Sequence, residues 1–298
     1  MKIGIDIGGS HIGVGIVNDQ NLIIRKKEHE WTKTEKKNLY DNMIKYCIDY
    51  IEQICKEENI DVHQIESVGI GFPNKKIKDG IIYTPERKIN IPREIINKYN
   101  IKSYLKNDVK CSGLCEKTIG NLKDYNNALF ITLGTGIGGA YYYQNKLVVP
   151  NTYQGFEVGH MIIKAGGKKC RCGNRGCFEE YASMNAFRSK FKKLYNLEKV
   201  NSKIVLEIYK SKEKEEELLK IIEEYIEYLS IGLSNLIYIF EPDAICIGGS
   251  FVHYEEIFLE KLKISLKEKF KNREIPSILL AKYANDAGII GASMLESN

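Results

Sequence analysis

One histidine and three cysteines lie close together near the middle of the chain, at His160, Cys170, Cys172 and Cys177. An imidazole nitrogen and three thiolates make a complete tetrahedral set of zinc ligands. Gly173 and Gly176 allow the chain to turn tightly enough to aim three sulfurs at one point. Because four protein ligands leave zinc no open position for a substrate, we expect a structural Zn²⁺ ion that fixes the neighbouring residues Glu157 and Glu179.

The alternative to a zinc site is a set of free or disulfide-bonded cysteines, since the chain has eight of them. Disulfide bonds require an oxidising compartment. No signal peptide is expected, because Met1 leads directly into an apolar strand pattern, and we therefore expect a cytoplasmic protein. The other five cysteines lie in regular segments and are interpreted as small, buried apolar residues: Cys47, Cys55, Cys111, Cys115 and Cys246.

Glycine-rich turns follow three apolar segments of the sequence, at 8–10, 134–139 and 248–250. Backbone N–H groups of such turns can bind an anion, and Ser10 and Thr135 add hydroxyl donors. The turn at 134–139 is similar to a dinucleotide fingerprint, but that motif requires a helix after the glycines, whereas residues 141–143 are tyrosines that favour a strand. Only the turn at 248–250 precedes an expected helix, whose N-terminal dipole favours phosphate.

Two aspartates near these segments could take part in phosphate chemistry. A plain tight turn is the alternative for each glycine motif alone, but three of them, with Asp6 before the first, indicate a nucleoside triphosphate. Asp6 can hold Mg²⁺ through water. Asp108, in Asn107-Asp108, follows a strand and begins a helix, where an aspartate often serves as a helix cap. The functional alternative is a general base that takes a proton from a hydroxyl as it attacks a γ-phosphate.

The segments that must position these residues follow a repeated pattern. Residues 2–8 and 12–17 are expected to form a glycine-turned strand pair, and 128–133 with 140–143 repeat it roughly 125 residues later, which indicates a duplicated half with its own sheet. Asp286 is expected to cap the final helix. Further strands are expected at 22–24, 67–72, 101–105, 244–248 and 278–281, and helices at 38–58, 108–119, 185–194, 202–210 and 213–240, the last ended by Pro242.

Length and composition are those of a globular protein. At 298 residues the chain can form two domains of ordinary size. Hydrophobic residues make up 43% and charged residues 28% of the chain, the usual balance for a soluble fold. No apolar run approaches the length of a membrane span, so no membrane contact is expected. The net charge of +5 is spread along the sequence, whereas nucleic-acid binding requires clustered basic residues, so no nucleic-acid partner is expected.

Motifs along nearly the whole chain resemble, in the same order, those of the ROK family of sugar kinases and repressors. The cysteine segment is the most specific of them. The resemblance implies an α/β, actin-like ATPase (ribonuclease H-like) fold with two α/β domains around a cleft, usually as a homodimer. The motifs are Asp6-Ile-Gly-Gly-Ser10, Asn107-Asp108, Leu133-Gly-Thr-Gly-Ile-Gly-Gly139, Glu157-x-Gly-His160, Cys170-x-Cys-Gly-x-x-Gly-Cys177-x-Glu179 and Ile247-Gly-Gly249.

The resemblance implies domain bounds and a role for each matching residue. The N-terminal domain is expected at 1–108, completed by a C-terminal helix at 286–298, and the larger domain at 109–285, with the zinc-bound loop at 157–179. Asp108 matches the catalytic base. The sugar-binding positions match Asn107, Asp108, Glu157, Glu179 and His160, which serves zinc with one ring nitrogen and sugar with the other, and Asn90 matches a looser contact. Asp6 is joined in the nucleotide site by Gly8, Gly9, Ser10, His11, Gly134, Thr135, Gly136, Gly248 and Gly249.

Two motifs depart from the usual family pattern. Where the family usually has Thr-Lys, this chain has Ser10-His11, which keeps the hydroxyl but removes a fixed positive charge near the phosphates. The family's Gly-Pro-Gly loop is Gly71-Phe-Pro-Asn74 here, and the resemblance implies that this segment faces the sugar.

We therefore expect an ATP- and Mg²⁺-dependent hexose kinase that phosphorylates the 6-hydroxyl of a small-molecule sugar, with glucose as the first choice. An N-acylhexosamine such as N-acetylmannosamine, or fructose, is the alternative substrate. The alternative of another class is a sugar-responsive repressor. Repressors of the family carry a DNA-binding helix-turn-helix, normally before the kinase-like part, and here the first strand begins at Lys2. A sugar-binding scaffold without catalysis is disfavoured, because Asp108 is present.

Overall fold

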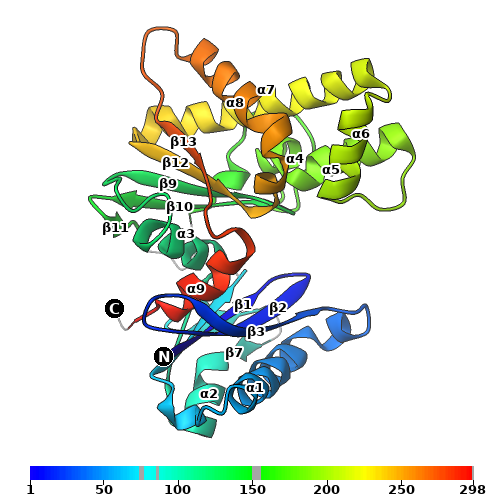
Figure 1. The fold of residues 1–298 in the computed structure, drawn as a ribbon. Coiled ribbons are helices and arrows are strands. Elements are labelled where there is room, and N and C mark those ends of the chain that lie inside the picture. Colours follow the sequence, from blue (N-terminus) through cyan, green and yellow to red (C-terminus); the bar gives the residue numbers. More distant parts are fainter. Residues whose placement is uncertain (74–76, 85–86, 150–155, 297–298) are drawn as a thin grey trace. The chain divides into compact units, whose positions relative to one another are not determined.

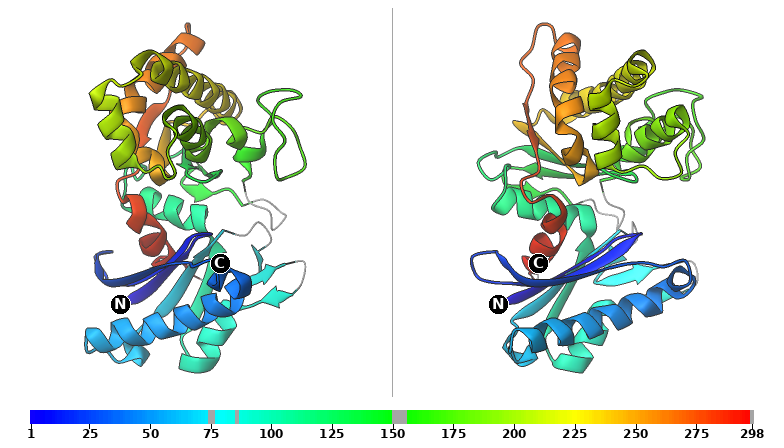
Figure 2. Two further views of the ribbon diagram at one scale, coloured as in Figure 1. Left: turned by 90° about the vertical axis from the view of Figure 1, so that its right-hand side faces the viewer. Right: turned by 45° about the vertical axis from the view of Figure 1, so that its right-hand side comes forward.

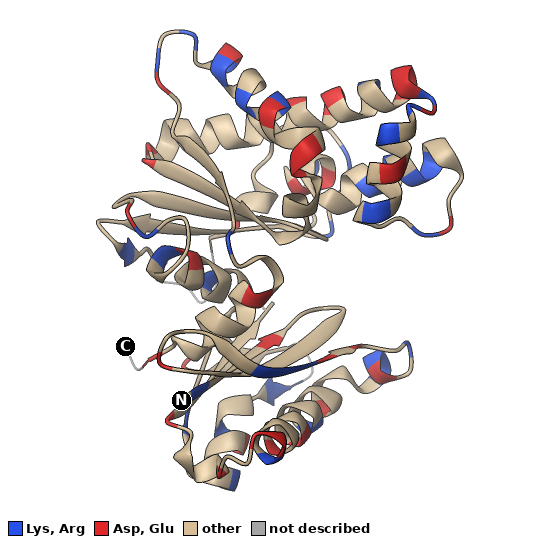
Figure 3. Cartoon of the chain, in the orientation of Figure 1, with Lys and Arg blue, Asp and Glu red and all other residues tan. Residues whose placement is uncertain are grey.

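A computed structural model describes the chain over residues 1–73, 77–84, 87–149 and 156–296. The departure from the family pattern at Gly71-Phe-Pro-Asn74 therefore lies partly outside the described residues, since Asn74 is not among them. Among the residues that are described, none of the helices combines the length and the apolar character that crossing a membrane requires. Figure 3 shows basic and acidic residues interspersed along the helices, in agreement with the even spread of charge in the sequence.

Contacts along the chain divide it into two compact units (Figure 1). The first consists of Met1–Lys123 and the C-terminal segment from Asn285, and the second of Asp124–Val148 and Phe156–Ala284. The first unit extends beyond the boundary expected at 108. The reason is that the helix after Asn107 packs against the C-terminal helix, within the first unit.

The first unit is built on a five-stranded mixed sheet of order β3-β2-β1-β4-β8. Strand β1 is antiparallel to β2 and parallel to β4. The central strands are rich in isoleucine and valine and buried on both faces, as a sheet covered by helices on both sides requires. The strands are β1 (Lys2–Ile7), β2 (His11–Val17), β3 (Ile23–Glu30), β4 (Ser67–Phe72) and β8 (Lys102–Asn107), and a small second sheet contains β5 (Ile77–Lys78), β6 (Ile81–Tyr83) and β7 (Lys88–Ile89).

Helices cover both faces of the first sheet (Figure 2). Helix α1 (Leu39–Glu57) buries Met43, Cys47, Ile51 and Ile54, which recur every three or four residues and so form one apolar face. The opposite face of the sheet carries α3 (Asp108–Thr118) and α9 (Ala287–Ser293). The other helices of this unit are η1 (Glu35–Asn38), η2 (Val62–Gln64), α2 (Ile91–Tyr99) and α3 (Asp108–Thr118), with η5 (Ala284–Asp286) leading into α9 (Ala287–Ser293).

The C-terminal helix α9 lies directly on the backbone of two strands. Gly4 of β1 and Gly69 of β4 are register partners. A Cβ at Gly4 would overlap the carbonyl oxygen of Ile289, and one at Gly69 would overlap that of Ala292. Glycine is therefore required for this close approach. The helix is shorter than the expected range of 286–298, and Asp286 does not cap it with its side chain, because Oδ1 accepts a hydrogen bond from Lys26 at 2.8 Å.

The second unit repeats the sheet of the first. Its strand order is β11-β10-β9-β12-β13, with β9 antiparallel to β10 and parallel to β12. The two glycine-turned strand pairs predicted from the sequence therefore occupy equivalent places in two sheets, and the predicted duplication is confirmed. The strands are β9 (Ala128–Leu133), β10 (Ile137–Tyr143), β11 (Lys146–Leu147), β12 (Ala244–Gly248) and β13 (Ser277–Leu280).

The helices of the second unit gather on one face of its sheet (Figures 1 and 2). The longest, α7 (Glu215–Phe240), ends directly before its C-cap Glu241, which has a left-handed conformation with φ of 40° and precedes Pro242, as the sequence predicts. Aromatic side chains of α5 and α8 pack together beneath it, among them Phe187 and Phe258 with ring centroids 4.9 Å apart. The helices are η3 (Val158–His160), α4 (Glu179–Ala182), α5 (Met184–Tyr195), α6 (Ser202–Ser211), α7 (Glu215–Phe240), η4 (Gly249–Tyr254) and α8 (Glu255–Lys269).

Candidate functional site

The first glycine turn connects β1 to β2 and places Asp6 opposite His11. Nε2 of His11 lies 3.8 Å from Oδ2 of Asp6, and Nδ1 lies 3.4 Å from Oγ of Ser10. The facing carboxylate of Asp6 raises the pKa of His11, which favours the protonated imidazole. His11 therefore restores part of the positive charge that a lysine would supply at this turn.

Trp31 holds the turn in place, a role that the sequence pattern does not reveal. Its indole Nε1 donates to the carbonyl oxygen of Gly8 at 3.0 Å, and its backbone N–H donates to the carbonyl of Ser10 at 2.8 Å. The N–H of Gly8 in turn donates to the carbonyl of His11 at 2.8 Å. These three hydrogen bonds fix the backbone of the turn.

Asp108 is the first residue of α3, at the carboxyl end of β8. The N-cap position belongs to Asn107, whose Oδ1 accepts from the N–H of Lys110 at 3.3 Å. The helix cap considered for the aspartate is therefore made by its neighbour. Burial, followed by the charge of Asp6, raises the pKa of Asp108 to about 7. A carboxyl with this pKa accepts a proton near neutral pH, as a general base must.

The strand register explains why the two aspartates influence each other. Asp6 is paired with Gly71 across β1 and β4, and Phe72 with Asn107 across β4 and β8. The carboxyl ends of these parallel strands meet at one edge of the sheet, which is where open α/β sheets bind ligands. Gly288 of α9 also lies against this edge, since a Cβ there would come within 2.5 Å of Oδ2 of Asp6. No motif in the sequence marks Gly288 as part of this edge.

Asn90 has a structural role in the first unit. Its Oδ1 accepts from the N–H of Arg93 at 3.0 Å and caps α2, in which Pro92 occupies the first turn. The amide nitrogen of the side chain is not used by this cap, and so the expected sugar contact stays a prediction.

The second unit brings the four expected zinc ligands together. The donor atoms of His160, Cys170, Cys172 and Cys177 all lie within 4.8 Å of one another. Sγ of Cys170 is 3.6 Å from Nδ1 of His160, and Sγ of Cys172 is 3.6 Å from Sγ of Cys177. A tetrahedral site with zinc–sulfur bonds of about 2.3 Å has ligand separations of about 3.8 Å, so the group fits zinc.

The electrostatics of this cluster also favour a cation. Burial, with a further contribution from the neighbouring thiols Cys172 and Cys170, raises the pKa of Cys177 to about 12. Three sulfurs this close cannot all be thiolates unless a positive ion neutralises them. The remaining cysteines of the chain are buried in regular segments, as predicted.

Backbone geometry in the loop agrees with the predicted need for glycine. Gly173 and Gly176 have φ of 98° and 86°, which side chains rarely adopt. The N–H of Cys170 donates to the carbonyl of Asn174 at 2.8 Å, and Cys177 forms an antiparallel bridge with Ile162. Hydrogen bonds within the loop thus hold its backbone compactly around the ligand atoms.

His160 presents its two ring nitrogens in different directions. Nδ1 faces the sulfur of Cys170, as given above, whereas Nε2 lies 3.9 Å from Oε2 of Glu157. An imidazole arranged in this way can bind a metal with one nitrogen and a substrate hydroxyl with the other. Glu157 immediately precedes η3, so the same short helix positions both side chains.

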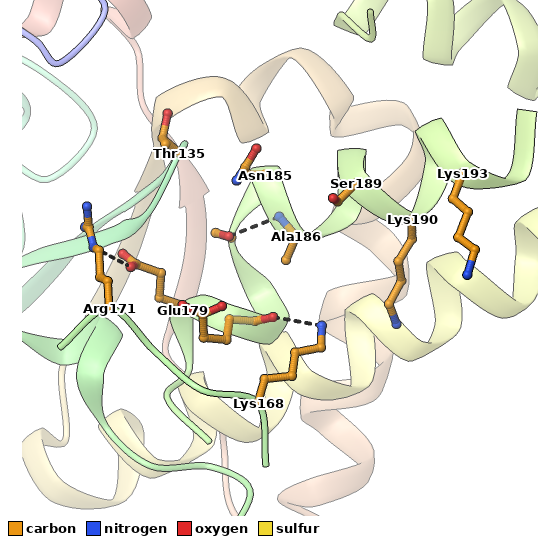
Figure 4. Close-up of a pocket in the computed structure, with 11 residues that line it drawn as sticks. Thr135, Lys168, Arg171, Glu179, Asn185, Ala186, Ser189, Lys190 and Lys193 are labelled. Atoms are coloured by element: carbon orange, nitrogen blue, oxygen red, sulfur yellow. Dashed lines mark hydrogen bonds and ion pairs between the residues drawn. The ribbon is translucent and has the colours of Figure 1, made fainter. Parts of the chain in front are cut away.

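Glu179 begins α4 and is almost fully buried. Its Oε2 accepts from the N–H of Ile137 at 2.9 Å, and its Oε1 lies 3.3 Å from Nε of Arg171 (Figure 4). Gly136 permits this contact, because a Cβ there would overlap the Glu179 carboxylate. The second glycine turn and Glu179 are therefore neighbours, and Arg171, inside the cysteine loop, is a partner that the sequence analysis did not identify.

The third glycine turn differs from the expectation in one respect. Gly248 ends β12, and Gly249 has φ of 72°, with its backbone against the carbonyl of Leu133. The helix that follows directly is the 3₁₀ helix η4, and α8 begins only at Glu255. A helix therefore follows the turn, as predicted, but it begins as a 3₁₀ helix, so the N-terminal dipole at the turn is weaker than that of a long α-helix.

The expected site residues thus form two groups. Asp6, the first turn, Asn107 and Asp108 belong to the first unit, and the second and third turns, the zinc ligands, Glu157 and Glu179 belong to the second unit. Within each unit, these residues lie near one another.

Comparison with known proteins identifies the class to which this arrangement belongs. The model of the ROK family matches residues 2–298, and the chain belongs to the ROK family. Its fold is that of the actin-like ATPases. A solved structure of a ROK family glucokinase from Streptomyces griseus, in complex with glucose and AMPPNP, has a TM-score of 0.80 at 23% identity, covering 98% of this chain and 97% of that one.

Two curated relatives represent two different activities within the family. The glucokinase of Thermotoga maritima is 27% identical over 98% of this chain and 96% of its own length. The xylose repressor of Bacillus subtilis is 27% identical over 90% of this chain and 69% of the repressor. Both kinds of protein contain the part that aligns with this chain. Overall similarity therefore does not distinguish a kinase from a repressor, and the distinction depends on the side chains of the site.

Proposed function

We propose that the protein is a hexose kinase that transfers the γ-phosphoryl group of ATP to the 6-hydroxyl of a hexose, most readily glucose. The observation that carries the proposal is Asp108. Its carboxyl lies at the carboxyl end of β8 and has a pKa of about 7, because it is largely shielded from solvent and shares its strand edge with Asp6. A repressor that only senses a sugar has no need of a carboxyl adjusted to accept a proton at neutral pH.

In the proposed reaction Asp108 accepts the proton of the 6-hydroxyl. The hydroxyl oxygen forms a bond to the γ-phosphorus while the bond from that phosphorus to the bridging oxygen of ADP breaks. The turns at Gly8–His11, Gly134–Gly136 and Gly248–Gly249 donate backbone N–H groups to the phosphates. Mg²⁺, held through water by Asp6, would supply charge neutralisation on the β- and γ-phosphates.

The family resemblance assigns sugar-binding roles to residues in each unit. Glu157, His160 and Glu179 provide acceptors and one ring nitrogen for ring hydroxyls, while Asn107 and Asn90 contribute side-chain amides. Zinc bound to His160, Cys170, Cys172 and Cys177 would keep Glu157, His160 and Glu179 in position. The ion has a positioning role, since four protein ligands leave it no open position.

Glucose is proposed over an acetamido sugar because the groups identified suit hydroxyls. No apolar niche for an acetamido methyl emerges from the residues that are assigned to the sugar. N-acetylmannosamine or another N-acylhexosamine is the second choice and fructose the third. We also infer a homodimer from the family resemblance, which light scattering on the purified protein would test.

A coupled assay of ADP release across a panel of hexoses and hexosamines tests the proposal. The wild-type protein should turn over ATP only when a hexose is present. Asp108→Asn should lower kcat by at least about 10²-fold, the low end for acid–base catalysis, while sugar binding persists. Asp19→Asn is a matched control, because that carboxylate is 79% exposed in the same unit. An Asp108→Asn protein that turns over at the wild-type rate would exclude the mechanism.

The repressor alternative makes a different prediction. A repressor would bind operator DNA with sequence specificity and release it when sugar binds, without consuming ATP. The even spread of charge on the described residues does not favour DNA binding (Figure 3). Sequence-specific, salt-sensitive duplex binding at nanomolar protein, without sugar-dependent ATP turnover, would favour the repressor.

A further inference from the structure

Glu179 has the lowest exposure of the residues assigned to the sugar, and its helix gives the side chain little support. The residue is 7% exposed and begins α4, a single helical turn of four residues. No side chain caps the start of this helix. The direction of the carboxylate therefore depends on the groups that contact its two oxygens.

The two oxygens of Glu179 have partners of different kinds. Oε2 accepts a hydrogen bond from the backbone N–H of Ile137, whereas Oε1 forms an ion pair with Nε of Arg171 (Figure 4). Within the described part of the chain, Arg171 is the one cation that forms an ion pair with this carboxylate. A carboxylate that is withdrawn from water needs an opposite charge, because a neutral donor satisfies an oxygen without balancing the charge. Arg171 therefore provides the counter-charge of Glu179.

Arg171 lies between two of the expected zinc ligands, Cys170 and Cys172. In this turn the N–H of Cys170 donates to the carbonyl of Asn174 at 2.8 Å, and the N–H of Gly173 donates to the carbonyl of Cys170 at 3.0 Å. Hydrogen bonds thus hold the backbone around Arg171, and a metal on both neighbouring cysteines would hold it further. A fixed backbone fixes the position from which the guanidinium reaches Glu179.

The ion pair contributes to orientation more than to stability. The Arg171 side chain is 71% exposed, and ion pairs with an exposed partner add little to the free energy of folding, since water competes for the charge. Removal of Arg171 should therefore leave the fold and the metal ligands intact. It would leave the Glu179 carboxylate held by a single hydrogen bond at Oε2, so that the side chain would sample several orientations.

We propose that Arg171 is a positioning residue for sugar binding: it holds the Glu179 carboxylate in one orientation and transmits to it the order of the zinc-binding loop. The inference rests on the proposed function, in which Glu179 accepts hydrogen bonds from sugar hydroxyls. Each carboxylate oxygen has two lone pairs, so both oxygens can accept a sugar hydroxyl and keep their present partners. The loop thus acts on the sugar directly through His160 and indirectly through Arg171 on Glu179.

Titration calorimetry of the full, zinc-loaded chain with glucose, fructose and N-acetylmannosamine measures sugar binding without catalysis. Arg171→Gln should weaken binding of the preferred sugar by at least about tenfold, close to 1.4 kcal/mol. Arg175→Gln is the matched control, because Arg175 lies in the same loop, is exposed and forms no ion pair with Glu179 in the described structure. Arg171→Lys should recover most of the affinity, since an ion pair through one nitrogen does not require the planar guanidinium.

Three further measurements separate positioning from a purely structural role. The zinc content and the midpoint of guanidinium unfolding should be the same in Arg171→Gln as in Arg175→Gln. In the coupled assay, KM for the sugar should rise at least about tenfold in Arg171→Gln, while kcat at saturating sugar and KM for ATP change by less than about twofold. In a Cys172→Ala background, Arg171→Gln should have little further effect on sugar affinity, because the loop that directs Arg171 is already loosened.

The outcomes distinguish a failure of this inference from a failure of the proposed function. Equal sugar binding in Arg171→Gln and Arg175→Gln, or a loss of affinity that occurs only together with a loss of zinc, would overturn the role of Arg171 and leave the kinase proposal standing. A full tenfold loss in the Cys172→Ala background would overturn the link to the loop. A wild-type protein that binds none of the three sugars would contradict both proposals.

Discussion

Replacing Asp108 by asparagine should stabilise the protein at alkaline pH although it lowers kcat. The ordinary pKa of this carboxyl is 3.8, and burial together with Asp6 raises it to about 7 in the folded state. The folded protein therefore binds the proton more tightly than the unfolded chain does. The stability that this proton provides is fully present below pH 3.8 and is lost as the pH rises to 7.

The size of the effect follows from the shift. About three pKa units at 1.36 kcal/mol each give an upper limit of about 4 kcal/mol, and we expect roughly half of it because the side chain keeps some contact with solvent. Asparagine has nearly the same shape and cannot ionise. Asp108→Asn should thus raise the free energy of unfolding by about 2 kcal/mol at pH 8, and by about a third of that at pH 5.

Guanidinium unfolding of the ligand-free protein at pH 8 and at pH 5 measures both numbers. Asp19→Asn provides the control, since that side chain is 79% exposed and should show little change at either pH. An Asp108→Asn variant that is no more stable than the wild type at pH 8, or whose gain is the same at both pH values, would refute the argument that burial strains this carboxylate.

The remaining predictions concern activity and metal content. The specificity constant kcat/KM should decrease as the pH falls below about 7, the pKa of Asp108. Asp6→Asn should move this decrease to lower pH, because it removes the charge that raises the pKa of Asp108 in addition to burial. An unchanged pH profile in Asp6→Asn would show that Asp6 does not influence Asp108. Elemental analysis should find one zinc per chain in protein purified under reducing conditions. Cys172→Ala should lower both the zinc content and the affinity for sugar, whereas the control Cys246→Ala should retain zinc. Full activity in protein that contains no zinc would contradict the proposed role of the site. Glucose should have the highest kcat/KM in a panel with fructose, mannose, N-acetylglucosamine and N-acetylmannosamine, and an acetamido sugar that exceeds it by tenfold, about 1.4 kcal/mol, would make the glucose assignment wrong.

The main elements of the fold could be predicted because their sequence signals are local and strong. Buried strands of isoleucine and valine, separated by glycine turns, revealed the duplicated sheet, and Pro242 marked the end of α7 correctly. Helix α2 was not predicted, because it has only nine residues, although Asn90 and Pro92 are ordinary start signals. The small sheet β5-β6-β7 was missed for a similar reason, since its strands have only two or three residues.

The site could be predicted where its chemistry depends on residue type and spacing, as for the four zinc ligands. Contacts between distant segments could not be predicted in this way. Trp31 reaches the first turn from the end of β3, and Arg171 reaches Glu179 by a side chain whose direction depends on the folded loop. The pKa of Asp108 likewise results from burial and from Asp6, which is far away in the sequence.

The packing of α9 on Gly4 and Gly69 has a consequence for biosynthesis. The first unit begins to emerge from the ribosome first, but the helix that covers its sheet is translated roughly 170 residues after Lys123, which takes about 10–30 s at usual rates of elongation. During that interval the backbone of β1 and β4 lacks this helix, whereas the second unit, whose last residue is Ala284, is completely translated before α9 and can already fold. The second unit should therefore fold before the first, although the first unit is translated earlier. Nascent chains halted before α9 should depend on chaperones to protect the incomplete first unit.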